Sequence, residues 1–354
     1  MTGATLVGIC TVTHDSAEHL EGYFAALSTL LAGAVRYELV LVDCASDDDS
    51  VARAESLSAA LPFPARVVAL RENRGFAGGI NEALSLLPAD AELALSLNPD
   101  ARPEPSAIEE LVRCHQDLHR NAFRVGAVTG RLVRPAGPGE PVRLDACGMR
   151  LRPTWRHFDR GSDALDRGQY DRREEVFGGT GAATLYRLAA LRDCAVEGAM
   201  FDPDFHSFRE DAELCFRLRE RGWRVVYEPR ARIEHRRRNL PRRRAQMSAA
   251  VNFHSLKNRY LLRILHETAI SFLLTLPSLP RELGILGHVC WQERSSLEAF
   301  RWVWRNRSRL LARRRWLRAR RTTSAWSVAA WFWRDAAPLH TEHRASVATL
   351  SLGR

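Results

Sequence analysis

Apolar runs alternate with stretches of helical periodicity along the first 100 residues of the chain. Runs of the kind that form buried strands occur at 6–13, 38–43, 66–70 and 92–97. Apolar residues recur at helical spacing at 20–27 and 50–60, between these runs. Strands that alternate with helices predict an α/β protein with a doubly wound sheet, in which ligands collect beyond the carboxyl ends of the strands.

Two of these predicted strands end in carboxylates. Asp43 closes the second strand, and the tripeptide Asn98-Pro99-Asp100 follows the fourth. Oxygen ligands at a strand end suit a hard divalent cation that keeps open positions for phosphates. The competing interpretation is an ordinary turn, because a tripeptide this short often arises by chance.

Glycines cluster between the third and fourth predicted strands. Gly75, Gly78 and Gly79 open a helical pattern that begins soon after Asn73. Glycines there let the backbone approach a phosphate or a sugar closely. The order differs from the GxGxxG dinucleotide fingerprint. The alternative is therefore a glycine-rich helix entry that only packs against the sheet.

A group of carboxylates opens a later helix, predicted at 208–223. Leu214 and Leu218 recur at helical spacing, which places Glu210 and Asp211 in the first turn. The helix dipole favours negative charge there, and a carboxylate at the rim of a site can accept a proton from an attacking hydroxyl. The alternative is the usual acidic bias of a helix start, followed by an ordinary amphipathic helix.

Further strand patterns surround that helix. They occur at 177–186, 223–229 and 231–235. His235 ends the last of them. A lone histidine is more often structural than a ligand, but its position after the carboxylate helix makes it a candidate. The stretch 151–175 is polar and rich in Arg and Asp, which predicts a mobile or substrate-contacting loop.

The composition is that of a globular protein. The chain has 354 residues, of which 45% are hydrophobic and 27% are charged, so it can bury a full core. Its seven cysteines are scattered without a CxxC pair or metal-ligand spacing, which indicates reduced thiols. The N-terminus lacks the pattern of a signal peptide. A cytoplasmic location is therefore expected.

Charge is distributed unevenly along the chain. Residues 1–230 hold 27 Lys and Arg against 35 Asp and Glu, whereas 231–321 hold 22 against 5. The second segment, with a net charge of +17, would suit nucleic acid, anionic lipid or a pyrophosphate. No nucleic-acid-binding signature accompanies it, and the arginines lie among Trp and Leu. A nucleic-acid partner is therefore less expected than a membrane surface.

The C-terminal part is helical in pattern and basic. We predict two domains, 1–240 for catalysis and 241–354 as a basic helical appendage, with arginine clusters at 236–238 and 242–244. The apolar stretch 268–280 has 13 uncharged residues and two prolines, which is too short to span a bilayer. Peripheral binding to the cytoplasmic face of a membrane is one interpretation. Packing on the catalytic domain with a solvated basic face is the equal alternative.

The ordered set of these motifs resembles the inverting, nucleotide-sugar-dependent family 2 glycosyltransferases, which have a GT-A fold. The turn Thr11-Val12-Thr13-His14-Asp15 is similar to the family's Thr-Tyr-Asn-like turn, and Asp43-Cys44-Ala45-Ser46 to its Asp-Asn-Ala-Ser. The loop Gly75-Phe76-Ala77-Gly78-Gly79-Ile80-Asn81 looks like its Gly-Phe-Ala-Gly-Gly-Asn-Asn. The resemblance covers roughly residues 6–260.

The second half of the motif set carries the reacting groups. Asn98-Pro99-Asp100 looks like the family's metal-binding Asp-x-Asp variant, and Glu210 to Arg217 is similar to its Glu-Asp-x-Asp-Leu-Cys-x-Arg. His235 falls where the family has a metal-contacting histidine. Bacterial rhamnosyltransferase-like and galactofuranosyltransferase-like members, which build cell-surface glycans, resemble the chain most.

The resemblance implies a donor pocket. Residues expected to line it are Thr11, Thr13, Asp43, Asn73, Gly75, Phe76, Gly78, Gly79 and Asn98. Within this set, Thr11 and Asp43 would hold the uracil or thymine base and the ribose. The donor would be a UDP- or dTDP-sugar, and the acceptor a glycan or a polyprenyl-linked glycan of cell-surface polysaccharide biosynthesis.

The resemblance also implies a division of catalytic roles. Asp100 and His235 would bind Mg²⁺ or Mn²⁺, which neutralises the charge that develops on the leaving diphosphate. Asp211, with Glu210 beside it, would act as general base on the opposite face of the sugar. One base suffices for single-step inversion, so no covalent nucleophile is required.

Several positions depart from the family pattern. His14 and Asp15 replace Tyr-Asn, Cys44 replaces Asn, and Ile80 replaces the first of two asparagines, so base and sugar selectivity are expected to differ. The Gln-x-x-Arg-Trp motif of processive synthases is absent from the sequence, which favours transfer of one sugar per encounter. Three alternatives stay open: a nucleotidyltransferase, a nucleic-acid-binding protein and a catalytically inactive relative.

Overall fold

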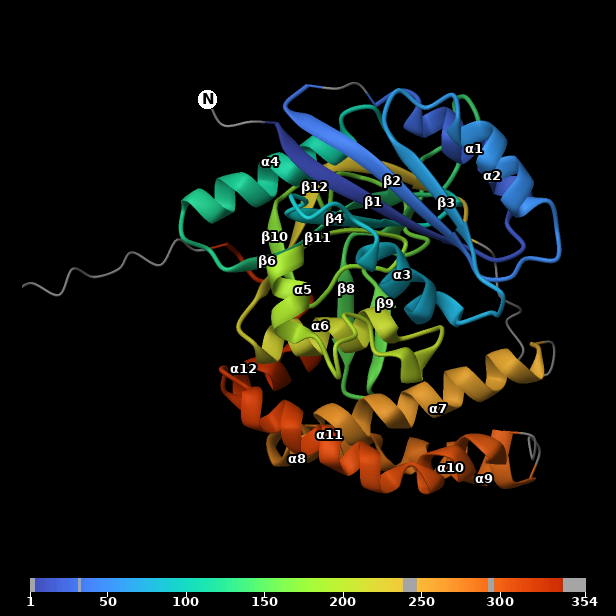
Figure 1. Ribbon diagram of the computed structural model, residues 1–354. Helices are drawn as coiled ribbons and strands as arrows, with labels where there is room; N and C mark the ends of the chain where they lie inside the picture. The colour runs from blue at the N-terminus through green and yellow to red at the C-terminus, as the bar shows by residue number, and fades with distance from the viewer. Residues whose placement is uncertain (1–3, 31–32, 238–246, 292–295, 340–354) are drawn as a thin grey trace, which may run out of the picture.

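The computed structural model describes residues 4–30, 33–237, 247–291 and 296–339. In this part of the chain, a mixed ten-stranded sheet carries helices on both faces, and a layer of C-terminal helices lies against one side (Figure 1). This is the α/β fold with a doubly wound mixed sheet and a helical C-terminal region that the sequence predicts.

The first four predicted apolar runs form strands whose ends differ from the prediction by at most three residues. The run predicted at 177–186 is a strand only over 183–187, and the runs predicted at 223–229 and 231–235 form one strand. The strands are β1 (Thr5–Thr13), β2 (Val35–Asp43), β3 (Ala65–Ala69), β4 (Leu93–Leu97), β5 (Ala101–Pro103), β6 (Val125–Val133), β7 (Leu144–Ala146), β8 (Met149–Arg152), β9 (Arg156–Asp159), β10 (Glu174–Val176), β11 (Ala183–Arg187) and β12 (Arg224–His235). The main sheet has the order β10-β12-β6-β11-β4-β1-β2-β3, with β5 paired to β12 and β7 to β6. β8 and β9 form a separate antiparallel pair.

The helices connect these strands and then form the C-terminal layer. The α-helices are α1 (Ala17–Leu27), α2 (Ser50–Ser58), α3 (Gly75–Ser85), α4 (Ala107–Arg120), α5 (Leu188–Cys194), α6 (Glu210–Glu220), α7 (Ala249–His266), α8 (Ala269–Thr275), α9 (Leu279–Trp291), α10 (Leu297–Arg305), α11 (Arg307–Arg320) and α12 (Ala325–Ala329). Short 3₁₀ turns are η1 (Pro203–Phe205), η3 (Leu276–Ser278) and η5 (Ala330–Phe332).

The parallel half of the sheet is buried on both faces because its strands are apolar on both. In β1, Val7 and Ile9 belong to the core that α1, α2 and α4 cover, whereas Leu6 and Cys10 belong to the core on the α3 side. β1 pairs in parallel with β2 and β4, so their carboxyl ends meet at one edge. That edge is where the sequence places Asp43 and Asp100.

Helix α6 lies between the sheet and the C-terminal layer, and it is buried on both sides. Leu214 and Leu218 pack in the core shared with the sheet, whereas Cys215 and Phe216 pack in the core shared with α7, α11 and α12. The C-terminal helices therefore fix the helix that carries the candidate base.

Buried charges reinforce this packing. Arg217 and Glu213, one turn apart on α6, form an ion pair of 2.6 Å inside the protein. His266 at the end of α7 contacts Glu213 at 3.3 Å and Glu220 at 3.2 Å. Burial disfavours the charged imidazole, but these two carboxylates outweigh it and raise the pKa of His266 to about 9.

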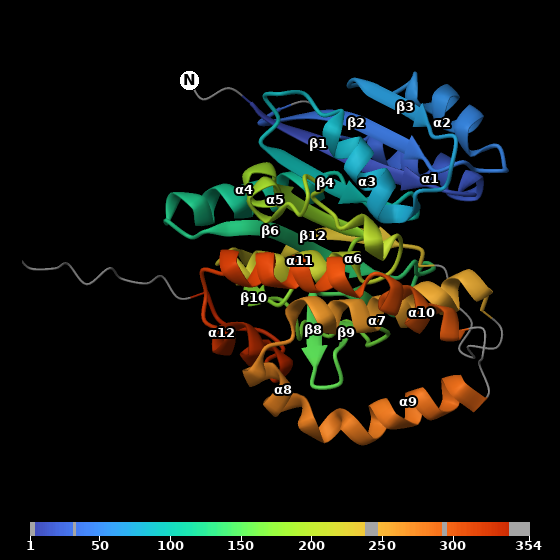
Figure 2. The same cartoon turned by 60° about the horizontal axis from the view of Figure 1, so that its bottom comes forward.

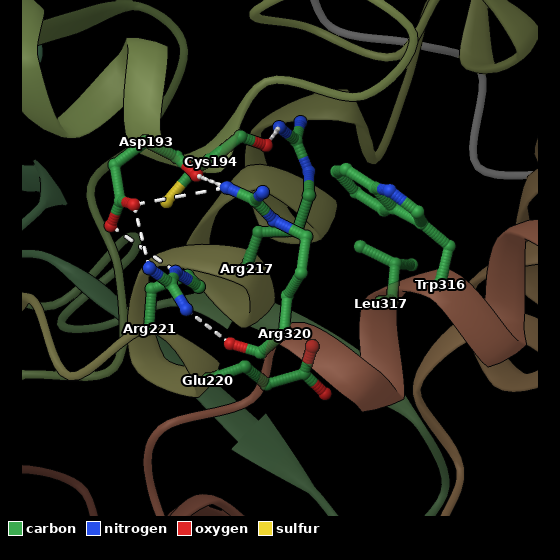
Figure 3. A pocket seen from close by; sticks show the side chains of 8 residues that line it. All are labelled: Asp193, Cys194, Arg217, Glu220, Arg221, Trp316, Leu317 and Arg320. Carbon is green, nitrogen blue, oxygen red and sulfur yellow. Dashed lines mark hydrogen bonds and ion pairs between the residues drawn. The ribbon is translucent and has the colours of Figure 1, made fainter.

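Helix α11 packs on α5 and α6 through a polar junction (Figure 3). Arg221 pairs with Asp193 at 2.7 Å, and Arg320 donates to the Asp193 carbonyl oxygen at 2.9 Å. The pocket between these side chains measures about 10 Å³, which is room for about one water molecule. This junction is a packing contact and not a ligand site.

Arginines of the C-terminal helices hold these helices to the catalytic body. Arg313 of α11 pairs with Asp202 and with Asp204, both at 2.7 Å. Arg314 donates to the carbonyl oxygen of Ile264 at 2.7 Å. Part of the positive charge of 231–321 is therefore neutralised within the protein. The arginines at 238 and 242–244 and the predicted domain boundary at 240 lie outside the described residues, so the boundary stays a prediction.

One expectation from the sequence is corrected, and another is tested only in part. The polar stretch 151–175, expected to be a mobile or substrate-contacting loop, includes the β8–β9 turn, β9 and the start of β10, and Trp155 at the β8–β9 turn is fully buried against Phe216 and Phe332. Contact of this stretch with a substrate stays a prediction. The stretch 268–280 continues as helix to Gly287, and one segment, Ala269–Gly287, is long and apolar enough to cross a membrane by length and composition, with 22% of it buried. The prolines do not stop this helix, because each lies at the start of a helical segment, where a missing N–H is tolerated.

Candidate active site

A cleft of about 240 Å³ opens at the carboxyl edge of the parallel strands. The ends of β1 and β4 and the loops after β2, before α3 and before α6 contribute its walls. It is lined by Val12, Thr13, His14, Ser16, His19, Cys44, Asn73, Gly75, Phe76, Asn98, Pro99, Asp100 and Ser207. Five of the predicted donor-pocket residues are in this set, namely Thr13, Asn73, Gly75, Phe76 and Asn98.

Asp43 does not line this cleft but holds Thr13, which does, in place by a hydrogen bond. Its carboxylate is buried and accepts hydrogen bonds from Thr13 Oγ1 at 2.8 Å, from Ser46 N at 2.8 Å and from Ser46 Oγ at 2.5 Å. The structure does not bring Thr11 to the cleft. Thr11 is fully buried, and its hydroxyl is hydrogen-bonded to Tyr23 of α1. Thr11 is therefore corrected from a donor contact to a core residue, because α1 covers its side of β1.

The first backbone N–H groups of α3 are already hydrogen-bonded within the protein. Gly75 N donates to Asn73 Oδ1 at 2.8 Å, Phe76 N to Ser207 Oγ at 3.2 Å, and Ala77 N to the His206 carbonyl oxygen at 2.8 Å. The first N–H groups of the helix, expected to approach a phosphate, are thus used to hold the loop before α6. A ligand at this wall meets side chains and glycine Cα atoms.

The other two glycines of this loop serve packing. A methyl group on Gly79 would lie 2.7 Å from Val12 and 2.9 Å from Cys44, and one on Gly78 would lie 2.4 Å from Arg74 Cβ. Gly79 therefore allows α3 to approach the sheet closely. For Gly78 and Gly79, the packing alternative stated from the sequence describes the structure better than contact with a sugar.

Gly75→Ala is expected to destabilise the protein more than a matched glycine substitution. Gly75 has φ +65°, and a methyl group there would lie 2.6 Å from the His206 carbonyl oxygen. Alanine pays about 1–2 kcal/mol for the left-handed conformation and about 1–3 kcal/mol more for the overlap. Gly198→Ala is the control, because Gly198 has φ +86° and open space around it. Equal losses in urea unfolding of the two variants would contradict the overlap.

Asp100 and His235 meet at the edge of the cleft. β12 pairs with β5 so that His235 lies opposite Ala101, and Ala101 is the residue that follows Asp100 in the sequence. The Nε2 atom of His235 is 3.3 Å from Asp100 Oδ1, and its Nδ1 atom is 2.7 Å from Asp145 Oδ2. Asp145 is fully buried and also contacts Arg134 at 3.0 Å. The imidazole is therefore held between two carboxylates.

This arrangement shifts the pKa values of both partners at the cleft. Burial disfavours charge on His235, but its hydrogen bonds to Asp100 and Asp145 outweigh burial and raise its pKa to about 9. Burial likewise opposes the charge on Asp100, but the contact with His235 outweighs it and lowers the pKa of Asp100. Asp100 is therefore an anion near neutral pH and is ready to attract a cation.

These residues fit a cation that is shared with a diphosphate. Among the described residues, no group of three or more His, Cys, Asp or Glu side chains is placed to hold a metal ion alone. Mg²⁺ at nucleotide sites is usually held by one or two carboxylates, and substrate phosphates and waters complete its shell. Asp100 at the rim, with His235 Nε2 facing it, supplies the protein side of such a shell.

Asp145 was not identified as a site residue from the sequence. Its only local signal is that it is the single acidic residue in the apolar run Leu144 to Cys147. A carboxylate on the far nitrogen of a metal-binding histidine orients the ring. Asp145→Asn is therefore expected to raise the Mn²⁺ concentration for half-maximal activity by about 10–100-fold. The control is Asp163→Asn, which removes an exposed carboxylate that also contacts Arg134. Equal Mn²⁺ requirements in both variants would contradict an orienting role.

Asp211 stands at the wall formed by the turn before β11. Its Oδ2 accepts from Gly181 N at 3.1 Å and its Oδ1 from Ala212 N at 2.7 Å. A methyl group on Gly181 would lie 3.6 Å from Asp211 Oδ2 and 3.8 Å from the ring of Phe76, which lines the cleft. The next residue, Ala182, accepts from Asn98 N at 2.9 Å. This turn thus links Asp211 to the cleft wall.

The neighbouring carboxylates Glu210 and Asp211 are not equivalent. Burial raises the pKa of Asp211, although the N–H groups of Gly181 and Ala212 oppose this by stabilising its anion. Burial and the charge of Asp211 raise the pKa of Glu210 well above its ordinary value, and Glu210 Oε2 is buried without a hydrogen-bond partner among the described residues. Glu210 therefore takes up the shared proton first, and Asp211 is the better candidate for a base.

The cleft thus brings together a space of about 240 Å³, the Asp100–His235 pair that can hold a cation, and the partly buried carboxylate of Asp211. A family model described as glycosyltransferase-like family 2 matches residues 9–253. The chain belongs to this family. It is a glycosyltransferase with a GT-A fold, as the motif set predicts. Among curated protein sequences, none matches the chain.

Solved structures with the same fold share little sequence with this glycosyltransferase. One of them is the crystal structure of GalNAc-T7 with UDP, GalNAc and Mn²⁺ (TM-score 0.53, 13% identity, covering 74% of this chain and 48% of that one). The chain thus spans about half the length of that protein. A second is the mannosyltransferase PcManGT from Pyrobaculum calidifontis with GDP-Man and Mn²⁺ (TM-score 0.51, 16% identity, covering 94% of this chain and 88% of that one). A third is S. aureus TarS, residues 1–349, with UDP-GlcNAc (TM-score 0.52, 15% identity, covering 93% of this chain and 90% of that one).

Proposed function

We propose that this glycosyltransferase transfers a single sugar, with inversion, from a UDP- or dTDP-sugar to a glycan or polyprenyl-linked acceptor. The reaction would belong to cell-surface polysaccharide biosynthesis at the cytoplasmic face of the membrane, and the sugar would be of the rhamnosyl or galactofuranosyl kind. The resemblance of the motif set supports the class of sugar. Solved structures of the same fold hold UDP, UDP-GlcNAc or GDP-Man, two of them with Mn²⁺.

One observation carries the proposal. Asp100 and His235 meet at 3.3 Å beside a cleft whose wall leads through Gly181 to Asp211. Inverting transfer needs two things at one sugar carbon, namely charge neutralisation at the leaving diphosphate and a base on the opposite face. An imidazole beside a carboxylate, which can share a cation, and a separate partly buried carboxylate fit these two needs.

The residues of the chain would act as follows. Asp100 and His235 would hold Mg²⁺ or Mn²⁺, which when bound supplies positive charge to the diphosphate. Thr13, Asn73 and Phe76 would orient the donor in the cleft. Asp211 would accept the proton of the acceptor hydroxyl as the oxygen attacks the sugar carbon and the bond to the diphosphate breaks.

Donor selectivity would depend on the departures from the family pattern that face the cleft. His14 and Cys44 line it, whereas Ile80 is buried in the core beneath α3. The side chains of His14 and Cys44 would therefore contact a donor bound in this cleft directly. Ile80 acts on packing.

A panel of UDP-, dTDP- and GDP-sugars, each with and without Mn²⁺, tests the proposal by thermal shift and by product analysis. The expected result is stabilisation by a UDP- or dTDP-sugar only with Mn²⁺, release of the nucleoside diphosphate, and an inverted anomeric centre by NMR. Release of pyrophosphate would favour nucleotidyl transfer instead. Stabilisation by duplex nucleic acid alone would favour the nucleic-acid-binding alternative.

A further inference from the structure

A second groove, of about 600 Å³, lies between the β8–β9 hairpin and the helical segment that runs from η3 into α9. Four arginines from these two elements face it. The lining residues are Arg150, Arg152, Pro153, Thr154, Arg156, Phe158, Pro277, Ser278 and Arg281. We refer to it as the arginine groove. It contains none of the residues assigned to the donor cleft.

The positive charge of the arginine groove is poorly neutralised within the protein. Arg150 pairs with Asp335 at 3.1 Å. Within the residues that the structure describes, Arg152, Arg156 and Arg281 form no ion pair with a carboxylate. The nearest acid on α9, Glu282, is already paired with Arg259. A groove with three uncompensated guanidinium groups attracts a multiply charged anion, and phosphate oxygens match the guanidinium geometry.

The pKa values record the same crowding of positive charge. Burial and the neighbouring Arg281 and Arg259 lower the pKa of Arg156. Burial, Arg259 and Arg156 lower the pKa of Arg209 to about 10. An anion in the groove would relieve this repulsion.

The β8–β9 turn connects the arginine groove to the candidate base. Trp155 at this turn stacks on Phe216 of α6, with ring centroids 5.6 Å apart, and donates from Nε1 to Thr275 Oγ1 of α8 at 3.3 Å. Its carbonyl oxygen accepts from Arg209 at 3.4 Å, and Arg209 precedes Asp211 by two residues. The hairpin that lines the groove therefore contacts both the helix that presents the base and the residue two positions before the base.

The outer side of the same helical segment is apolar and exposed. Figure 2 shows α8 and α9 at the margin of the molecule farthest from β1, β2 and β3. Leu273 is 62% exposed, Leu283 68% and Trp291 85%, and Phe272 and Leu286 are also exposed. An exposed apolar strip of this kind beside arginines is typical of a surface that lies in the headgroup region of a bilayer.

We propose that the arginine groove binds the phosphate or diphosphate head of a lipid-linked acceptor while α8, η3 and α9 rest in the membrane surface. This inference rests on the proposed function, because the acceptor must bring its hydroxyl to Asp211. A lipid-borne phosphate is favoured over a soluble phosphorylated glycan because the exposed apolar residues belong to the same helical segment as Pro277, Ser278 and Arg281 of the groove. The groove shares no lining residue with the donor cleft, so the donor and the acceptor phosphate would bind at separate places.

Co-sedimentation with vesicles tests this inference. The vesicles contain phosphatidylcholine with phosphatidic acid, or phosphatidylcholine alone, and the proteins are the full chain, Arg156→Gln/Arg281→Gln, and Leu273→Ser/Leu283→Ser. The control is Arg113→Gln/Arg120→Gln, which removes two exposed arginines from α4 on the opposite side of the sheet. Melting temperatures of all four proteins show whether each is folded.

The expected result is binding of the wild type and the control to phosphatidic acid vesicles, with about 30-fold weaker binding by Arg156→Gln/Arg281→Gln, since each interfacial arginine contributes about 1 kcal/mol. The leucine variant is expected to bind more weakly as well. Equal binding by all four proteins would overturn the proposal. Absence of vesicle binding, with stabilisation of the wild type but not the arginine variant by inorganic pyrophosphate, would overturn the lipid assignment. Donor binding by the wild type is measured separately, and only its absence counts against the proposed function.

Discussion

Asp211→Asn is expected to lower kcat by about 10²–10⁴-fold while donor binding stays within about twofold of the wild type. Asparagine keeps the shape of the side chain, and its Oδ1 can still accept from Gly181 N or Ala212 N. It cannot accept the proton of the acceptor hydroxyl. The measurement is single-turnover transfer with saturating donor and acceptor, together with calorimetric donor affinity.

Glu210→Gln separates the roles of the two neighbouring carboxylates. Because Glu210 holds the shared proton more strongly than Asp211, its amide is expected to preserve more activity than Asp211→Asn. If Glu210→Gln loses more activity, the base is Glu210 and the assignment made here is reversed.

The pH dependence of activity is expected to follow from the raised pKa of Asp211. A general base works only when it is ionised, so activity falls as the pH falls through the pKa of Asp211. Burial raises that pKa above its ordinary value, so the acidic limb of the rate profile is expected at a higher pH than for an exposed aspartate. Asp211→Asn is expected to remove this limb from the residual activity.

Asp100→Ala is expected to weaken Mn²⁺-dependent donor binding by at least about 10²-fold, because several kcal/mol of charge neutralisation at the diphosphate are lost. Chelation of the metal from the wild type is expected to produce a similar loss, and chelation is expected to have little further effect on Asp100→Ala. Calorimetric titration of the donor with and without Mn²⁺ measures both. A variant that keeps wild-type donor affinity and wild-type Mn²⁺ dependence would contradict the metal role.

The strand ends were predictable from the sequence because apolar runs and their terminal carboxylates are local patterns. Asp43 and Asp100 lie where the ends of parallel strands meet, and the helix predicted at 208–223 is present as α6, Glu210–Glu220. The partner of His235 was not predictable. Asp145 is 90 residues away, and the two meet only through the pairing of β7 and β12 with β6.

Side-chain direction and burial caused the remaining errors. Thr11 and Thr13 point to the same face of β1, but α1 covers Thr11 and leaves Thr13 at the open edge. The first N–H groups of α3 are engaged by the loop at His206 and Ser207, from a distant part of the chain. No local pattern records such contacts.

We expect one cleft to hold both the diphosphate of the donor and a cation bound by Asp100 and His235. The most direct measurement is an anomalous difference map from a crystal of the protein grown with UDP and Mn²⁺. The expected result is one Mn²⁺ peak at bonding distance from an Asp100 carboxylate oxygen, facing His235, with the diphosphate of UDP in its shell. UDP bound in the cleft with no peak at Asp100, or a peak that avoids Asp100 altogether, would contradict a cation site at Asp100 and His235.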